Sequence, residues 1–317
     1  MKRRMLVQLV VPLLVLCVLF SLLAYPAGRD RRQPDLLEVS VIFREADDDV
    51  WSTARQGMEQ AASDLNVELR FLTPTEEDTA AEQAQLLARE VEGGAGAVVL
   101  LPADRAALNA AAAAASEQAA LVTMETELAA AAACVGPDNA ALGQALAQTA
   151  LNGVAEGGTV VLLDSARGDN GIRERLEAAG DVLAQAGRRT VVCRPEQGEP
   201  LVQALEETLR AVRADAVVAF EASALEQAGE LAQAAESFPL LYGMGSTAAI
   251  AAGLERSRIT AIAAQNEFSA GYLAVEAAAK LARRQTVHPA EPLAFTIVRR
   301  ENMYEPDNQK LLFPVTR

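Results

Sequence analysis

The sequence predicts an α/β protein in which two Rossmann-like, doubly wound parallel sheets are covered by helices on both faces. From Glu38 onward, a short run of β-branched and aliphatic residues is followed by an alanine-rich helical stretch about ten times. The strand-like runs are nearly continuous in apolar residues, which is typical of strands buried on both faces. About 280 residues follow this point, which is more than one hydrophobic core usually supports and indicates two lobes.

The first half alternates strands and helices up to a turn. Short apolar runs predict the strands, and alanine-rich stretches of high helix propensity predict the helices. The expected strands are 39–43, 67–72, 97–101, 120–124 and 132–135, and the expected helices are 51–65, 79–91 and 105–117. The turn Gly136-Pro-Asp-Asn139 closes this half, because Asp138 or Asn139 can cap a following helix.

The second half repeats the same alternation and ends in a polar tail. Its expected strands are 159–163, 189–193, 216–220, 239–243, 260–264 and 293–298. Its expected helices are 140–155, 170–186, 199–213, 223–236, 246–254 and 267–283.

The N-terminal segment predicts export from the cytoplasm. Three basic residues precede Met5–Gly28, an uncharged stretch of 24 residues that is long enough to span about 30 Å of hydrocarbon. Residues 1–28 are therefore a signal or a membrane anchor, and 29–37 form a polar tether. Tyr25 occupies a position that a cleavage site keeps small, which favours retention in the membrane through residues 5–28 over cleavage. Lipidation of Cys17 is a third route, although Leu16 precedes it where a small residue is expected. Each route places the protein outside the cytoplasm, membrane-anchored or secreted.

Composition excludes several classes of function. From residue 36 onward the chain has 41 acidic and 22 basic residues, a balance that excludes a nucleic-acid partner. The single histidine, His288, excludes a histidine-based triad and a multi-histidine metal site. Cys134 and Cys193 lie in or beside apolar runs and are expected to be buried, unpaired thiols. Gly243-Met-Gly245-Ser-Thr-Ala248 fits a G-x-G-x-x-A dinucleotide fingerprint, but it follows the ninth strand and not the first, where this motif belongs. The sequence contains neither a G-x-x-x-x-G-K stretch nor a G-x-S-x-G elbow, so we expect no cofactor, no metal and no enzymatic activity.

Four short segments carry a resemblance to a known family. They are Trp51-Ser-Thr-Ala-Arg-Gln-Gly57, Val122-Thr-Met-Glu125, Gly136-Pro-Asp-Asn139 and Gly171-Ile-Arg-Glu-Arg175. With the order of elements, they resemble the type I periplasmic sugar-binding proteins related to ribose-binding protein, over nearly all of 38–317. The resemblance implies two lobes joined by three hinge crossings, near 138, 265 and 290. One lobe would comprise 38–138 plus 266–290, and the other 139–265 plus 291–317.

The resemblance, together with the positions of the residues, gives six candidate ligand contacts: Asp49, Trp51, Glu125, Arg173, Glu221 and Gln265. An aromatic ring can pack on the apolar face of a sugar, and a guanidinium can donate two hydrogen bonds to vicinal hydroxyls. Glu125, Glu221 and Gln265 each end a strand, where ligands of this fold class bind. The alternatives are a packing role for Trp51, an exposed arginine paired with Glu177 for Arg173, and a solvated acidic run for Asp49.

Three departures from the family pattern leave the ligand open. Thr126 stands where the family has arginine, Glu221 where asparagine is common, and Gly245 where aspartate is common. Ribose is therefore not expected, and the alternatives are other sugars, polyols, small polar molecules or a pocket that no longer binds a ligand. The resemblance implies a binding protein that delivers its ligand to an ABC permease. A membrane-anchored sensor or regulatory protein without transport is the alternative, and a permease or a histidine kinase among neighbouring genes would separate the two.

Overall fold

The computed structural model describes residues 36–45, 48–75, 79–165, 168–196, 198–287 and 291–313, without the side chains of Asp48 and Asp49. The unit from Leu37 onward contains every helix and strand of this description. None of the described helices is both long and apolar enough to span a bilayer. The expected anchor at residues 5–28 and His288 lie outside the described residues.

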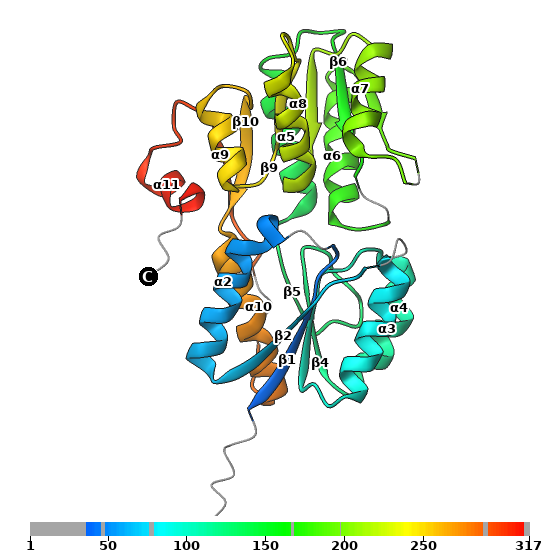
Figure 1. Ribbon diagram of the computed structural model, residues 1–317, viewed down its shortest axis with the longest axis vertical. Coiled ribbons are helices and arrows are strands. Elements are labelled where there is room, and N and C mark those ends of the chain that lie inside the picture. Colours follow the sequence, from blue (N-terminus) through cyan, green and yellow to red (C-terminus); the bar gives the residue numbers. More distant parts are fainter. Residues whose placement is uncertain are drawn as a thin grey trace, which may run out of the picture. The chain divides into compact units, whose positions relative to one another are not determined.

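The first sheet has five parallel strands in the order β2-β1-β3-β4-β5 (Figure 1). Its strands are β1 Leu37–Ile42, β2 Val67–Leu72, β3 Ala97–Leu100, β4 Ala120–Met124 and β5 Ala133–Val135. The central strands β1, β3 and β4 are short and mostly buried, as sheets with helices on both faces require, whereas the edge strands β2 and β5 are partly exposed.

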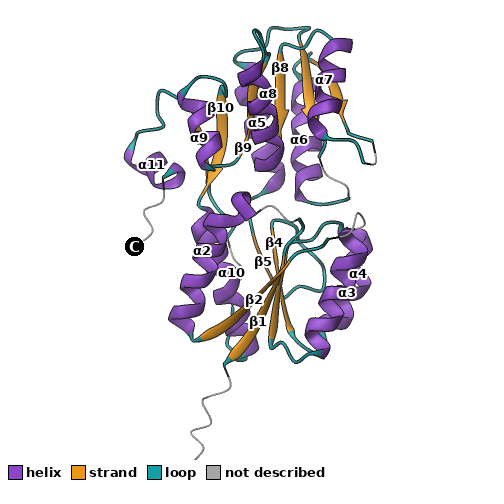
Figure 2. Cartoon of the chain, viewed as in Figure 1, coloured by secondary structure: helices purple, strands orange, loops and turns teal. Residues whose placement is uncertain are grey.

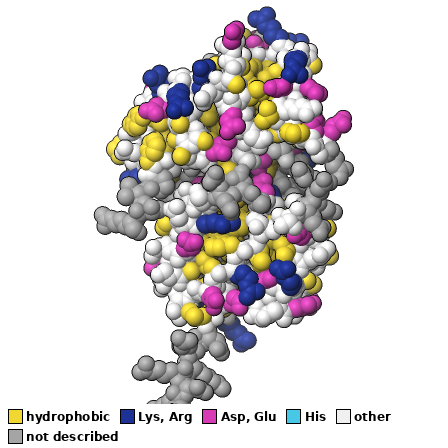
Figure 3. Space-filling view, viewed as in Figure 1, with side chains coloured by type: hydrophobic (Ala, Val, Ile, Leu, Met, Phe, Trp, Pro, Cys, Tyr) yellow, Lys and Arg dark blue, Asp and Glu magenta, His cyan; other side chains and the backbone are white. Residues whose placement is uncertain are grey.

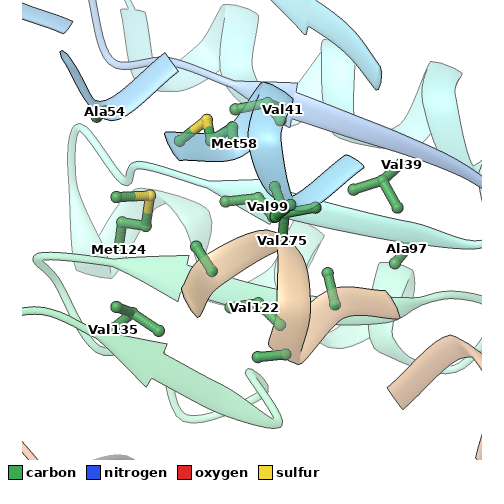
Figure 4. Packing of buried hydrophobic residues seen from close by; sticks show 14 of the residues in the cluster. Val39, Val41, Ala54, Met58, Ala97, Val99, Val122, Met124, Val135 and Val275 are labelled. Atoms are coloured by element: carbon green, nitrogen blue, oxygen red, sulfur yellow. The ribbon is translucent and has the colours of Figure 1, made fainter. Parts of the chain in front are cut away.

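Helices cover both faces of this sheet. They are α2 Asp48–Leu65, α3 Thr79–Glu92, α4 Arg105–Ser116 and α10 Glu267–Ala282. Alternate residues of a strand point to opposite faces. Val39 and Val41 accordingly pack with α2 and α10, as Figure 4 shows, whereas Ile42 packs with α3 and α4.

Two glycines bring α2 and α10 into backbone contact. A Cβ on Gly57 would lie 1.9 Å from the Phe268 carbonyl oxygen, and one on Gly271 would lie 2.0 Å from the Ala54 carbonyl oxygen. These glycines allow α10, which comes from the far end of the sequence, to close the first sheet's core. We call this sheet and its four helices the first lobe.

The second sheet has six strands in the order β11-β10-β9-β8-β6-β7, of which only β11 is antiparallel to its neighbour. Its strands are β6 Thr159–Leu163, β7 Arg189–Cys193, β8 Ala216–Ala219, β9 Leu240–Met244, β10 Ala261–Gln265 and β11 Phe295–Val298. The remaining helices are α5 Asn139–Leu151, α6 Gly171–Gln185, α7 Leu201–Ala211, α8 Ala222–Ala234, α9 Ala248–Glu255 and α11 Pro306–Leu312 (Figure 2). Helices α5 and α6 cover one face and α7, α8 and α9 the other. We call this sheet and these six helices the second lobe.

The chain passes between the lobes three times, after β5, after β10 and after α10. The first and third passages are adjacent, because the Leu293 N–H donates to the Gly136 carbonyl at 2.8 Å. The predicted fold class, two parallel-dominated α/β lobes joined by a hinge of three segments, is confirmed.

Two expectations about the second half and the cysteines can be compared directly with the structure. The polar tail expected after residue 298 is wrong, because it contains α11, which starts at Pro306 and buries Leu312. Proline suits the first turn of a helix, but a helix of seven residues with two leucines gives little periodic signal. Cys134 and Cys193 are free thiols, as expected, but only Cys193 is buried, and Cys134 is half-buried on the edge strand β5.

Candidate functional site

A cavity of about 590 Å³ lies where the strands of both sheets end. Its wall includes Arg44 after β1, Glu125 after β4, Glu221 after β8 and Gly245 after β9. The first turns of α2, α9 and α10, α8 as far as Glu230, Arg175 of α6 and the end of α11 also line it. The cavity is therefore built by both lobes, at the edge where parallel sheets of this class bind ligands.

Arg44 joins the two lobes at the centre of this cavity. Its Nη1 lies 3.0 Å from Oε2 of Glu125 in the first lobe, and its Nη2 lies 3.4 Å from Oε2 of Glu221 in the second. Nη2 also lies 3.3 Å from the Glu45 carboxylate. Burial opposes the charge of Arg44, but these three carboxylates outweigh it and hold its pKa above the ordinary value.

Glu125 forms a second ion pair with an arginine of the other lobe. The Nη2 of Arg175 lies 3.4 Å from Oε1 of Glu125. Burial alone would raise the pKa of Glu125, but Arg175 and Arg44 lower it to about 2. The backbone of Glu125 has a φ of +60°, and the Thr126 N–H donates to the Met124 carbonyl at 2.6 Å. This tight three-residue turn directs the Glu125 side chain between the two guanidinium groups, at a conformational cost.

The structure brings Arg175, and not the expected Arg173, to the cavity wall. Arg175 is 1% exposed, and its guanidinium donates to Asn139 Oδ1 at 2.7 Å and to the Phe220 carbonyl at 2.9 Å. Arg173 donates instead to the Gly168 carbonyl at 3.1 Å and lies 3.7 Å from Asp164.

Helix geometry explains this difference. Two residues turn a helix by about 200°, so the two arginines lie on opposite sides of α6. The buried stripe of α6 runs through Ile172, Leu176, Ala179 and Leu183. Arg175 follows Ile172 by three residues and therefore lies on this stripe. The helical periodicity of the apolar residues could thus have identified Arg175 from the sequence.

Trp51 lines the cavity but is 95% buried in the first lobe. Its ring centroid lies 5.8 Å from that of Phe43 and 5.5 Å from the Arg44 guanidinium carbon. Its indole N–H has no hydrogen-bond acceptor among the described residues. The ring thus takes part in packing and in the wall of the cavity.

The other candidates have different positions. Glu221 is buried in the cavity wall. Gln265 is buried at the end of β10 but is not among the lining residues. Asp49 is the second residue of α2, and its side chain lies outside the described residues.

The cavity is also lined by three carboxylates that were not among the candidates from the sequence: Glu226, Glu230 and Glu267. Glu267 directly follows the β10 end and the helix cap Asn266, a position that could have identified it. Burial and the charge of Glu125 raise the pKa of Glu267 to about 7, against the effect of the Gln265 amide. Burial and the charge of Glu45 raise the pKa of Glu221 to about 7, against the effect of Arg44.

Beside the cavity, the lobes meet in a direct hydrogen-bonded contact that we call the seam, formed by 103–105 and Thr126 on one side and 169–171 on the other. The Arg105 N–H donates to the Asp169 carbonyl at 2.7 Å, and the Asn170 amide donates to the Ala103 carbonyl at 2.9 Å. The hydroxyl of Thr126 accepts from the Gly171 N–H at 2.9 Å. Thr126, which replaces the family's arginine, thus connects the lobes.

Gly245, which replaces the family's aspartate, leaves no space for a side chain. Its φ is +136°, and a Cβ would lie 2.6 Å from Ile250 Cδ1 and 2.9 Å from Ala222 Cβ. An aspartate here would require the α8 and α9 starts to move apart.

Two α/β lobes that enclose a polar cavity define a two-lobed small-molecule-binding fold. Residues 39–286 match the family model described as a periplasmic binding protein domain, and the chain belongs to this family. No curated protein matches the chain significantly.

Solved structures share the fold at low sequence identity. A solute-binding protein of an ABC transporter from Agrobacterium vitis, with bound D-fucose, aligns with a TM-score of 0.80 and 18% identity over 87% of this chain and 100% of its own. A carbohydrate transporter solute-binding protein from Agrobacterium radiobacter, in complex with D-arabinose, aligns with a TM-score of 0.80 and 18% identity over 88% and 99%. A putative LacI transcriptional regulator from Bacteroides fragilis aligns with a TM-score of 0.74 and 14% identity over 84% and 98%.

Proposed function

We propose that this protein is an extracytoplasmic solute-binding protein that closes its two lobes over a small polar ligand of the sugar or polyol class for an ABC importer. The observation that carries this proposal is the cavity between the lobes, to which each lobe contributes charged side chains. The bound sugars of the two Agrobacterium proteins support the ligand class.

The arrangement of the two lobes suits a reversible closure, and we assign no catalytic step to the cavity. We infer that 38–138 plus 266–290 and 139–265 plus 291–317 move as two bodies about the three connecting segments. Separation would break the Arg44–Glu221 and Arg175–Glu125 contacts and the hydrogen bonds of the seam. Because these contacts are few and polar, ligand bound between the lobes would shift the equilibrium toward the closed state.

Thermal unfolding of the purified full chain against sugars, polyols, nucleosides and amino acids tests the proposal. A ligand at about 100 times its dissociation constant stabilises a protein by about 2.7 kcal/mol, which raises the unfolding midpoint by several degrees. Trp51 is the chain's only tryptophan, so its fluorescence gives a second readout from the cavity wall.

A matched pair of variants localises the binding. We expect Glu221→Gln to weaken the response and Glu59→Gln, at an exposed position on the first lobe, to leave it unchanged. If no compound changes either the midpoint or the fluorescence, the ligand class is wrong.

A membrane-anchored sensor without transport is the second candidate, because a putative transcriptional regulator shares the fold. Deletion of the gene separates the two functions. Loss of uptake of the identified ligand supports the importer, whereas unchanged uptake with a lost transcriptional response supports the sensor.

A further inference from the structure

The lining of the cavity has an excess of negative charge. Two guanidinium groups, Arg44 and Arg175, face five carboxylates: Glu125, Glu221, Glu226, Glu230 and Glu267. On the visible outer face, acidic and basic side chains are instead interspersed (Figure 3). The chain as a whole is acidic, with 41 acidic and 22 basic residues from residue 36 onward, and the cavity gathers part of this excess of negative charge in one space.

Both guanidinium groups are already engaged with Glu125. Its Oε2 lies 3.0 Å from Arg44 Nη1, and its Oε1 lies 3.4 Å from Arg175 Nη2. Glu221 has one contact with Arg44, at 3.4 Å. Within the described part of the chain, neither Glu267 nor Glu230 has a cation at ion-pair distance.

Helix N-termini do not remove this imbalance. Their partial positive charge falls off within the first turn. Glu230 lies more than two turns into α8, at the exposed rim of the cavity, and is beyond this range. Glu267 is at the first turn of α10, yet its pKa is raised to about 7 by burial and by Glu125.

We propose that the ligand carries a positive charge, as an ammonium group on a hydroxylated small molecule of the amino-sugar or amino-polyol class. This rests on the proposed function, whose cavity it concerns. Glu221 is buried and shares Arg44 with Glu45 and Glu125, and the half-buried Glu267 has no cation at ion-pair distance in the described part of the chain. Carboxylates taken from water are costly unless they are paired, so a bound ammonium would compensate this excess of negative charge, whereas a neutral sugar would not. Glu230 at the rim would attract the same charge during approach.

The arrangement favours an organic cation over a metal ion. In the described ranges, no three acidic, histidine or cysteine side chains are grouped closely enough to hold a metal. Trp51 contributes one feature that suits an organic ligand. Its buried indole N–H, without an acceptor in the described part of the chain, can donate to a ligand hydroxyl.

Matched ligands test this inference. We would titrate the full chain with D-glucosamine, N-acetyl-D-glucosamine and D-glucose, and with the corresponding galactose series, following Trp51 fluorescence and the unfolding midpoint. We expect an amino sugar to bind at least about 10-fold more tightly than its neutral partners, as charged hydrogen bonds imply, and added salt to reduce the difference.

Each other outcome has a distinct meaning. If a neutral sugar binds as tightly as its amino partner, the charge inference is overturned and the proposed function stands. If no amino sugar binds, the charge inference is overturned as well. In that case, binding of any neutral sugar keeps the proposed function, and binding of none removes its support.

Variants separate charge from shape. We expect Glu267→Gln to reduce the amino-sugar affinity at least about 10-fold and to change the affinity for any neutral sugar little. Glu59→Gln should change neither. Since both ligands are measured on the same variant, partial misfolding lowers both affinities, and only the ratio decides. An unchanged ratio in Glu267→Gln would contradict the role of its charge.

Discussion

The two lobes meet through two regions of opposite character, the seam and the cavity. In the seam, backbone and amide groups satisfy one another directly, as in the Arg105–Asp169 and Asn170–Ala103 hydrogen bonds. In the cavity, charges meet in unequal numbers, and Glu267 and Glu221 have pKa values raised to about 7. The seam therefore fixes how the lobes approach, whereas the cavity leaves electrostatic energy that a ligand can recover.

The largest expected effect lies at Glu125, which holds the cavity's two arginines. Glu125→Gln would leave Arg44 and Arg175 buried with one partner fewer each, and we expect a loss of about 3–5 kcal/mol in the free energy of unfolding. Urea denaturation measures it. Glu127→Gln, two residues away and exposed, is the control and should change stability by less than about 0.5 kcal/mol. Similar values for both variants would show that the charge network contributes little.

A smaller effect is expected at the seam, where Gly171 has no space for a methyl group. A Cβ there would lie 2.7 Å from Asn139 Nδ2 and 2.9 Å from the Glu125 carbonyl oxygen. We expect Gly171→Ala to cost about 1–3 kcal/mol by overpacking. In Gly180→Ala, on the same helix, the new methyl meets only Leu162 Cδ1 at 3.6 Å, so this variant should gain about 0.5–1 kcal/mol. Equal responses in thermal unfolding would argue against a rigid seam.

The smallest effect is a dependence of stability on pH that arises in the cavity. Glu267 and Glu221 have folded pKa values of about 7, above the ordinary 4.5, so the folded state binds more protons between these values. Their contribution to stability is present below pH 4.5 and is lost as the pH rises toward 7. Glu125, with a pKa of about 2, contributes constantly above pH 4.5.

Comparison of the wild type with Glu267→Gln isolates this contribution. Between pH 5 and pH 8, we expect the wild type to lose about 1–2 kcal/mol more than the variant, measured by urea denaturation at each pH. Parallel pH profiles of the two proteins would mean that ionisation of Glu267 does not lower the free energy of unfolding.

The sequence predicted the fold well because its signal is repeated in nearly every element. The apolar runs and alanine-rich stretches mark all strands and helices except α11, whose seven residues carry too few apolar positions. The site was harder to predict, because a side chain's direction depends on helix phase. Arg173 and Arg175 share one motif, and only the buried stripe of α6 distinguishes them.

Other features of the site depend on contacts between distant segments. Thr126 meets Gly171 only because the lobes meet, and Gly245 is restricted by Ala222 from another helix. Glu267 faces the cavity because α10 returns to the first lobe. No local pattern reveals such contacts.

The position of α11 has a practical consequence for labelling. Leu312 is part of the cavity wall, and the next residue, Phe313, is 42% exposed. Consecutive Cα atoms are about 3.8 Å apart, so a dye attached at Phe313 starts one residue away from the cavity wall. Such a probe can report on occupancy but can also obstruct it. A probe beside Leu36, before the start of β1 and so at the opposite end of that strand from Arg44, is the better choice when the binding itself is to be left undisturbed.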